Sequence, residues 1–288
     1  MIIIDYSGIA VAAAFSQKQP DRLDQGLVRH MILNSLRMHN AKNRRKYGEM
    51  VITCDSTSWR KEVFPEYKAS RKKNREASSV DWNKFFTMVN VVRDEIKENF
   101  PYPVITVDRA EADDIIGTLV LDSQEFGRNE ETLIVSGDKD FLQLQKYSNI
   151  HQYSPVQKKF LKSDDPHRYL FEHICKGDSS DGVPNVLSSD NTFTEELRQT
   201  PLRSKRIDEW WENRNNLQDS MDSDVWRNYQ RNDWMINLDK TPNEIREKTR
   251  KQLEEQSSRK NNKILNYLIT NRCSLLVESA QEFFVLNK

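Results

Sequence analysis

Acidic residues follow four short apolar segments of this chain, at the points where strands would end. The segments end at residues 4, 54, 107 and 135. The acids that follow them are Asp5, Asp55, Glu111, Asp113, Asp114, Asp138 and Asp140. A single acid after a strand commonly caps a helix or forms a turn. Acid beyond four such segments, twice in close groups, is more than capping requires and indicates a shared site.

These side chains should crowd together, because sites in open α/β sheets form at the carboxyl ends of the strands. Carboxylates in close contact raise one another's pKa, and a divalent cation removes that conflict. Oxygen-only ligands favour Mg²⁺ or Mn²⁺ over Zn²⁺. Two such cations about 3.5–4 Å apart stabilise the attacking and leaving oxygens of phosphoryl transfer. The sequence therefore predicts two Mg²⁺ ions, for which Mn²⁺ can substitute.

Strands and helices alternate along the first part of the chain. Strands are expected at residues 2–4, 50–54, 103–107, 133–135 and 149–154. Apolar residues at helical spacing predict helices at 27–38, 85–100 and 110–126. Continuous apolar strands between helices are typical of a mostly parallel sheet that is covered on both faces. We therefore predict an α/β fold with the acids at one edge of its central sheet.

The composition changes after about residue 160, where strand-like segments become rare. We predict an α/β domain over residues 1–160 and a mainly helical region over 161–288. Within the second region, residues 240–263 are expected to form a solvated helix or a linker. Four tryptophans are expected to anchor helix packing rather than to stack on bases: Trp210, Trp211, Trp226 and Trp234.

A basic segment with interleaved aromatic residues lies directly after Asp55. Residues 59–75 carry seven Lys and Arg against two Glu, together with Trp59, Phe64 and Tyr67. The whole chain has 44 basic and 44 acidic residues, so attraction to a polyanion must be local. Basic groups neutralise phosphates, and aromatic rings stack on exposed bases. We predict a basic arch over residues 59–80, the alternative being a solvated loop without a partner. The candidate nucleic-acid contacts are Arg60, Lys61, Tyr67, Lys68, Arg71, Lys72, Lys73 and Arg75.

Four motifs occur in order along the first 190 residues. They are Phe64-Pro-Glu-Tyr-Lys-Ala-Ser-Arg71, Glu111-Ala-Asp-Asp114, Ser136-Gly-Asp-Lys-Asp140 and Gly177-Asp-Ser-Ser-Asp-Gly-Val-Pro184. Together they resemble the flap endonuclease and 5′-exonuclease family, in particular the branch that contains the ribonuclease H of T-even bacteriophages. The resemblance implies the PIN-like α/β fold of 5′ nucleases, with a helical region after it that binds DNA.

The resemblance also implies roles for individual residues. A first metal site would be served by Asp5, Asp55, Glu111, Asp113 and Asp138. A second, looser site would be served by Asp140, Asp178 and Asp181. Asp114 fills the fourth position of its motif and is counted among the candidate metal ligands. Lys68 and Arg71 match a motif that contacts the scissile phosphate and the 5′ end, and they join Asp113 and Asp138 as candidate catalytic residues.

One segment departs from the family. Residues 183–192 read Val-Pro-Asn-Val-Leu-Ser-Ser-Asp-Asn-Thr, without the glycine-rich hairpin that grips the duplex backbone. Close approach of a backbone to phosphate relies on such glycines. Neither that grip nor the potassium ion often held there is therefore assumed for this chain.

The implied function is that of a metal-dependent 5′→3′ exonuclease and flap endonuclease on RNA–DNA and DNA duplexes, with 5′-phosphate products. The implied biological role is the removal of RNA primers during phage lagging-strand replication. The implied partners are duplexes with 5′ ends or flaps and a single-strand-binding protein. Residues 279–286 also resemble a sliding-clamp-binding peptide weakly. We expect a monomer in the cytoplasm.

Other residue types argue against further classes of site. Three isolated cysteines indicate neither a zinc cluster nor a disulfide framework and fit a reducing compartment. Neither a signal peptide nor a membrane span is expected. The scattered histidines are predicted to be surface or packing residues: His30, His39, His151, His167 and His173.

Three other classes of protein share part of this pattern. A haloacid-dehalogenase-type phosphatase needs a second Asp two residues after the first, where this chain has Ser7. A PIN-type ribonuclease usually lacks both the basic arch and the Gly-Asp-x-x-Asp-Gly segment. A non-catalytic DNA-binding module of the same fold would have lost some of the acids. The last two stay open as alternatives.

Overall fold

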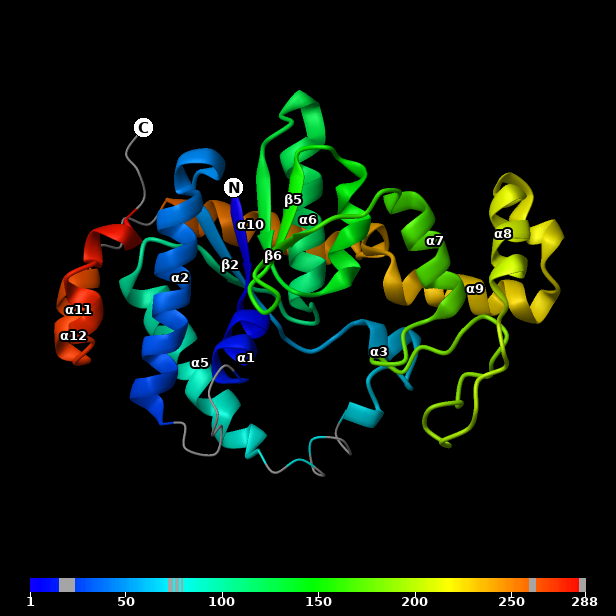
Figure 1. The fold of residues 1–288 in the computed structure, drawn as a ribbon, viewed down its shortest axis with the longest axis horizontal. Coiled ribbons are helices and arrows are strands. Elements are labelled where there is room, and N and C mark those ends of the chain that lie inside the picture. Colours follow the sequence, from blue (N-terminus) through cyan, green and yellow to red (C-terminus); the bar gives the residue numbers. More distant parts are fainter. Residues whose placement is uncertain (16–23, 72–74, 76–77, 79, 259–262, 285–288) are drawn as a thin grey trace.

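The computed structural model describes residues 1–15, 24–71, 75, 78, 80–258 and 263–284. Among these residues, six strands form one sheet in the order β3-β2-β1-β4-β5-β6 (Figure 1). The strands are β1 (Ile2–Asp5), β2 (Met50–Cys54), β3 (Val104–Thr106), β4 (Thr132–Val135), β5 (Ile150–Ser154) and β6 (Lys159–Leu161). The first five are parallel, and β6 pairs antiparallel with β5. The predicted mostly parallel sheet is confirmed.

Helices connect these strands and continue beyond them. The first part contains α1 (Tyr6–Phe15), α2 (Gln25–Tyr47), α3 (Arg60–Val63), α5 (Trp82–Asn99), α6 (Ala112–Gln124), η2 (Glu125–Gly127) and η3 (Lys139–Lys146). The second part contains α7 (Pro166–Lys176), α8 (Ser204–Glu212), η4 (Arg214–Ser220), α9 (Ser223–Ile236), η5 (Leu238–Lys240), α10 (Asn243–Ser257), α11 (Ile264–Thr270), α12 (Ser274–Val277) and η6 (Ala280–Phe283).

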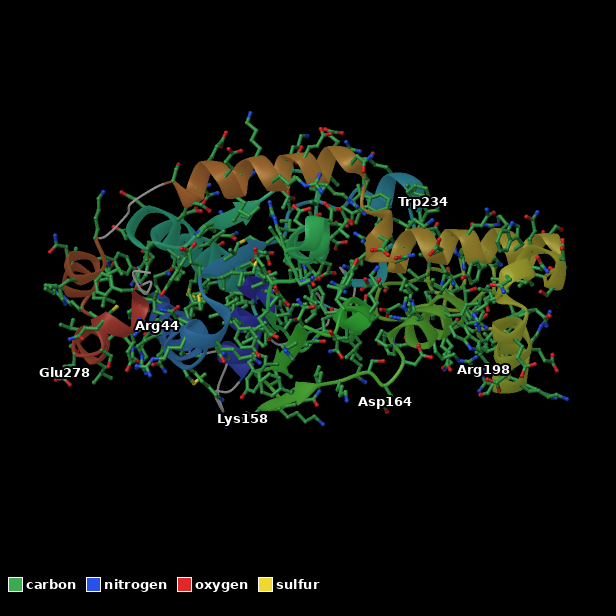
Figure 2. All side chains as sticks on the ribbon, turned by 90° about the horizontal axis from the view of Figure 1, so that it is seen from above. Arg44, Lys158, Asp164, Arg198, Trp234 and Glu278 are labelled. Atoms are coloured by element: carbon green, nitrogen blue, oxygen red, sulfur yellow. The ribbon has the colours of Figure 1, made fainter. Side chains whose placement is uncertain are left out.

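Alternate residues of β1 face opposite sides of the sheet, because successive side chains of a strand alternate in direction. Ile2 and Ile4 belong to a core shared with α2 and α5. Ile3 faces the other side, where Ile116 of α6 and Ile245 of α10 are buried. Figure 2 shows α10 along one side of the molecule and α2, which carries Arg44, along the other. Both faces are therefore covered, as the continuous apolar strands predict.

Three local features differ from the prediction. Helix α1 follows Asp5 directly, and the short strand β6 follows β5; neither was predicted. The helix predicted at 27–38 extends to Tyr47, so that Arg44, Arg45 and Lys46 form the last turn of α2. Cations are favourable at a helix C-terminus, because the backbone carbonyls there carry partial negative charge.

The region after residue 160 is mainly helical, as predicted. Helices α7 to α9 share an apolar cluster in which Trp210 is buried and Trp211 and Trp226 are partly buried. Three of the four tryptophans thus support helix packing. Trp234 is 44% exposed and meets the ring of Trp59 edge to face.

Helix α10 is a packed helix and not a linker. Gln256 both donates to and accepts from the backbone of Val104, at 2.9 Å in each case. Gln252 donates to the Thr106 carbonyl at 2.7 Å and accepts from the Thr106 N–H at 3.2 Å. These two side chains satisfy the hydrogen-bonding groups of the edge strand β3, which would otherwise be open to pairing with another chain.

The last helices return to the sheet. Ile264, Leu268 and Phe283 join the core that contains Ile2 and Ile4, so residues on both sides of the predicted boundary at 160 share one core. Phe283, the aromatic side chain that a clamp-binding peptide would present, is fully buried. The predicted peptide is thus part of the fold as far as residue 284; residues 285–286 lie outside the described residues. No helix among the described residues is long and apolar enough to cross a bilayer.

Candidate metal-dependent active site

The strand ends bring the predicted acids to one edge of the sheet. Strands β1 and β4 are neighbours, and Asp5 ends β1 while Asp138 lies just beyond β4. The chain order reverses between these two strands, which is where open α/β sheets place their sites. Asp55 lies just beyond β2, on the other side of β1. The charges of Asp55 and Asp138 both raise the pKa of Asp5, so the three carboxylates interact.

Asp5 is held at the start of α1. Its carboxylate accepts hydrogen bonds from the Ser136 hydroxyl at 2.7 Å and from the Gly8 N–H at 2.9 Å. A Cβ at position 8 would lie 2.4 Å from an oxygen of Asp5, so only glycine fits there. Burial and the charge of Asp55 outweigh these hydrogen bonds and raise the pKa of Asp5 to about 6.

The N-terminus of α6 places two further acids. Asp55 is exposed, and its Oδ1 accepts a hydrogen bond from the Ala112 N–H of α6 at 2.8 Å. Asp113 lies in the first turn of the same helix. Burial and the charge of Asp138 raise the pKa of Asp113 well above its usual value. Buried carboxylates that repel one another are stabilised by a bound cation, and their hard oxygen donors fit Mg²⁺.

Glu111 differs from Asp5 and Asp113 because its charged neighbours include the cations Lys68 and Arg60. Its oxygens accept hydrogen bonds from Ser58 at 2.7 Å, from Tyr67 at 2.9 Å and from Lys68. Burial acts to raise the pKa of Glu111, but Lys68 and Arg60 outweigh it and hold the pKa at about 2. Glu111 is thus ionised and already paired, and it fixes Lys68 beside the other acids.

Two predicted site residues are structural. Asp114 is fully buried and accepts from the Arg60 guanidinium at 3.0 Å, the Trp59 indole at 3.1 Å and the Thr241 hydroxyl at 3.0 Å. Arg60 is 2% exposed and also donates to the Met235 carbonyl at 2.8 Å. The prediction of Asp114 as a metal ligand and that of Arg60 as a nucleic-acid contact are wrong. Their charges serve instead to join the arch to α6 and α9.

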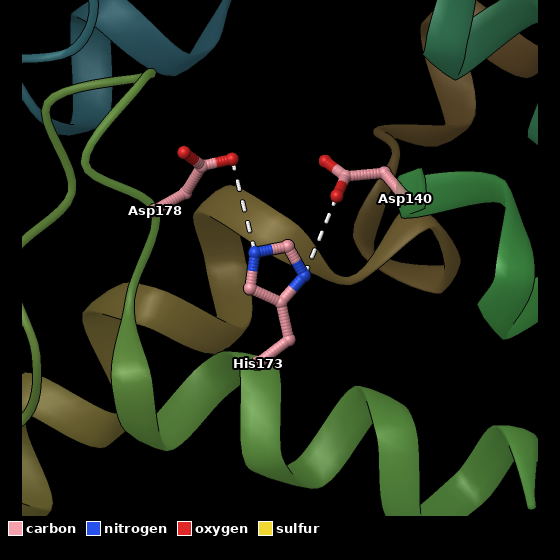
Figure 3. A group of neighbouring side chains, drawn as sticks. All are labelled: Asp140, His173 and Asp178. Carbon is pink, nitrogen blue, oxygen red and sulfur yellow. Dashed lines mark ion pairs between the residues drawn. The ribbon is translucent and has the colours of Figure 1, made fainter. Parts of the chain in front are cut away.

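A second cluster lies beside the first and contains a histidine. Asp140, His173 and Asp178 each offer a ligand atom within 4.8 Å of the others, the one such group of three or more among the described residues (Figure 3). His173, predicted as a surface or packing residue, packs against Tyr169 and also lies between these two acids. Its position four residues before Gly177 of the Gly-Asp-x-x-Asp motif, one helical turn away, is the signal that could have identified it.

Electrostatics differ within this cluster. Burial and the charge of Asp138 raise the pKa of Asp140 to about 7. Burial acts to raise the pKa of Asp178, but hydrogen bonds from His173 and Ser180 hold it well below its usual value. Burial and the charges of Asp181 and Asp178 raise the pKa of Asp138, so the two clusters are electrostatically continuous.

Asp181, predicted as a third ligand of the second site, faces the basic arch. It accepts a hydrogen bond from the Tyr67 hydroxyl at 2.9 Å, and Lys68 and Arg71 form ion pairs with it. Lys68 therefore bridges Asp181 and Glu111. The structure places Asp181 with these cations and not in the group of Asp140 and Asp178.

A cavity of about 650 Å³ is lined in part by described residues of the segment predicted as a basic arch. Its lining includes Asp55, Lys61, Lys68, Arg71, Arg75, Trp82, Phe86 and Glu111. The cavity thus joins the acidic edge of the sheet to basic side chains. The predicted contacts Lys72 and Lys73 lie outside the described residues.

The aromatic residues at this cavity are not those that were predicted. Trp59, Phe64 and Tyr67 are all buried, so none offers a ring face to a base. Trp82 and Phe86 line the cavity instead, stacked with their ring centroids 5.7 Å apart. Trp82 and Phe86 are four residues apart in the first turns of α5, so they lie on one face of the helix. This spacing, with polar Asp81 and Asn83 on either side of Trp82, is the feature of the sequence that could have identified the pair.

Comparisons with known proteins agree with this geometry. Residues 1–169 match the 5′–3′ exonuclease N-terminal resolvase-like domain, and residues 166–283 match the C-terminal domain of T4 RNase H. Ribonuclease H of Enterobacteria phage T4 is 32% identical over 292 residues, which span 98% of this chain and 95% of that protein. Flap endonuclease Xni of Shewanella sp. strain MR-4 is 28% identical over 154 residues, 51% of this chain and 55% of that protein.

Solved structures show the same fold. Bacteriophage T5 flap endonuclease, crystallised with DNA and metal ions, superposes with a TM-score of 0.60 at 15% identity, over 90% of this chain and 99% of that one. T5 5′-exonuclease with bound zinc gives 0.59 at 16% identity, over 89% and 99%. With its acids gathered at the sheet edge and its sequence matched from end to end, this chain belongs to the 5′–3′ exonuclease family and is a phosphodiester-hydrolysing nuclease of the branch with a T4 ribonuclease H-type C-terminal region.

Proposed function

We propose that this nuclease is a two-metal, Mg²⁺-dependent enzyme that trims 5′ ends and flaps from RNA–DNA and DNA duplexes. The observation that carries the proposal is the cavity lined in part by the predicted arch, where Asp55 and Glu111 lie among Lys61, Lys68 and Arg71. Carboxylates alone would repel a polyanion, whereas bound cations and a basic rim together attract it. The 5′ end of a single nucleic-acid strand, with its negatively charged phosphates, fits this combination of charges.

The residues have separate roles in the proposal. Asp5, Asp55, Asp113 and Asp138 would hold the first ion, while Asp140 and Asp178 would hold the second. Ions bound in this way activate water and stabilise the leaving oxygen of a phosphodiester. Lys68 and Arg71 would bind the phosphoryl oxygens, since both are fixed beside the acids by Glu111 and Asp181. Burial acts to lower the pKa of Lys68, but Asp181 and Glu111 raise it overall, so Lys68 stays charged.

The substrate class follows from the relatives. The T4 relative is named ribonuclease H and the Shewanella relative is named a flap endonuclease. We infer that this chain removes RNA primers ahead of DNA synthesis in phage replication, acting as a monomer in the cytoplasm of the infected cell. A single-strand-binding protein remains a proposed partner. A sliding clamp is not proposed as one, because Phe283 is part of the core.

The test compares nicked, 5′-flap and RNA-primed duplexes carrying a 5′ label. Wild type with Mg²⁺ should release short products with 5′-phosphates. Asp138→Asn should lose several kcal/mol of transition-state stabilisation, on the order of 100-fold or more in rate, while still binding DNA. Asp164→Asn, at an exposed acid before α7 (Figure 2), is the matched control and should cut normally. Full cleavage in EDTA, or by Asp138→Asn, contradicts the proposal.

A further inference from the structure

The second cluster differs in its donor atoms from the all-carboxylate set at the strand ends. His173 lies on α7 between two acids from other elements (Figure 3). Its Nδ1 is 3.3 Å from Oδ1 of Asp140, and its Nε2 is 3.7 Å from Oδ2 of Asp178. The Nδ1 atom is buried and has no hydrogen-bond partner of suitable geometry among the described residues. A buried polar atom without a partner is costly, so an occupant that pairs with this nitrogen is favourable here.

The two carboxylates keep one oxygen each toward the imidazole. Oδ1 of Asp178 accepts the backbone N–H of Ser180 at 2.7 Å and that of Asp181 at 3.3 Å, which leaves Oδ2 facing His173. Asp140 presents Oδ1 from the first turn of η3. Each carboxylate thus directs one oxygen at a ring nitrogen, and a cation bound in this group would replace that contact with the imidazole.

The position of His173 is determined by its surroundings. Tyr169, one turn earlier on α7, meets the imidazole ring edge to face with centroids 5.9 Å apart. Gly177 ends α7 with φ of +68°, and Asp178 follows it. The backbone N–H groups of Asp178 and Val183 donate reciprocally to the carbonyls of Val183 and Asp178, at 2.8 Å each. Two backbone hydrogen bonds therefore hold the turn that carries Asp178, and the contact with Tyr169 orients the imidazole.

From this geometry we propose that His173 is a direct ligand of the second divalent cation and gives that site a nitrogen donor. The inference rests on the proposed two-metal function. Mg²⁺ prefers oxygen ligands and retains its waters, whereas imidazole suits later divalent metals, and affinity of a nitrogen-containing site rises from Mn²⁺ along the series. The second site should therefore prefer Mn²⁺ to Mg²⁺ more strongly than the first.

A different arrangement uses the same residues. A protonated His173 would itself be the cation between Asp140 and Asp178 and would not bind a metal. The two arrangements differ in one spectroscopic property, because only a metal-bound imidazole couples its ¹⁴N nuclear spin to an unpaired electron on Mn²⁺.

The experiment loads the full-length protein with Mn²⁺ to two equivalents. Electron paramagnetic resonance would count the bound ions, and electron spin echo envelope modulation would detect directly coordinated ¹⁴N. Wild type should bind two ions and show the nitrogen coupling. His173→Gln should lose the coupling and weaken one Mn²⁺ site by about 10–100-fold, the loss expected for removing even an outer-sphere partner. Its Mg²⁺ affinity should change less.

His167→Gln is the control, because His167 is exposed on the same helix. It should keep the coupling and both affinities. Two bound Mn²⁺ ions in wild type without nitrogen coupling would overturn the assignment of His173 and leave the two-metal function standing. Binding of fewer than two ions would overturn both. The wild-type spectrum decides the question even if His173→Gln fails to fold, and coupling that survives in a folded His173→Gln also overturns it.

Discussion

Asp5 and Glu111 lie at the same edge of the sheet but have opposite electrostatic surroundings. Glu111 is paired with Lys68 and Arg60, and its pKa is held at about 2. Asp5 has acids for neighbours, and burial with the charge of Asp55 raises its pKa to about 6. Burial and the charge of Asp138 raise the pKa of Asp140 to about 7. Glu111 therefore stabilises the fold through its cations, whereas Asp5 and Asp140 destabilise it when they ionise.

The first prediction concerns stability against pH. A carboxyl whose folded pKa is raised stabilises the fold below its unfolded value, near 4, and that stability is lost as pH rises through the folded pKa. In EDTA, the melting temperature should fall between pH 5 and pH 8, by roughly 5 °C. Glu111 does not oppose this trend, since its own contribution is lost only at lower pH, between about 4.5 and 2.

Added Mg²⁺ should reverse the loss. Calorimetry with 10-fold different Mg²⁺ concentrations should show a larger rise in melting temperature at pH 8 than at pH 5, because protons compete with the cation for Asp5 and Asp140. Equal stabilisation by Mg²⁺ at both pH values would contradict the assignment of these acids to the metal sites.

At the scale of elements, the turn after α7 connects the second cluster to the arch. Lys68 donates its backbone N–H to the Asp181 carbonyl at 2.7 Å, and Gly182 lies against the Glu66 carbonyl. The turn that carries Asp178 thus supports the cations of the arch as well. A change in this turn should affect both metal binding and substrate binding.

The second prediction compares two glycines with left-handed φ. Gly177→Ala would place a Cβ 2.3 Å from the Val183 carbonyl oxygen, whereas a Cβ at Gly127 would meet no described atom within 4 Å. Both substitutions also carry a backbone penalty of about 1–3 kcal/mol for a side chain at positive φ. Gly177→Ala should in addition displace Asp178 and weaken one Mn²⁺ site. Isothermal titration would measure this, and equal effects of the two substitutions would argue against a rigid turn.

At the scale of the whole molecule, charge is segregated and not in excess. Net charge is zero, with 44 basic and 44 acidic residues. The cations that line the cavity lie next to the acids of the sheet edge. Other charges form ion pairs over the surface, such as Arg250 with Asp122 and Arg227 with Asp190. DNA binding should therefore depend on a few local cations.

The third prediction follows for binding against salt. Each phosphate neutralised contributes about −0.9 to the slope of log affinity against log salt concentration. Lys61→Ala, at the cavity, should reduce the magnitude of that slope by about 1. Lys205→Ala, at an exposed position of α8, is the control and should leave the slope unchanged. Fluorescence anisotropy with a labelled flap at several salt concentrations would measure both, and equal slopes would remove Lys61 from the interface.

The sequence by itself determined the α/β fold and the acids at its edge. Apolar runs such as Ile2–Ile4 specify strands locally, and parallel strands necessarily end at one edge, so Asp5, Asp55 and Asp138 could be placed without coordinates. The Gly-Asp-x-x-Asp motif also indicated where a second group of ligands begins.

Only the tertiary structure decided which charged side chains gather at the sheet edge and which form buried pairs. Arg60 and Asp114 have the residue types of a site, but their burial depends on Met235 and Thr241, more than 100 residues away. His173 meets Asp140 because α7 packs against η3. Side-chain partners of this kind are set by the packing of distant elements, which no local periodicity in the sequence encodes.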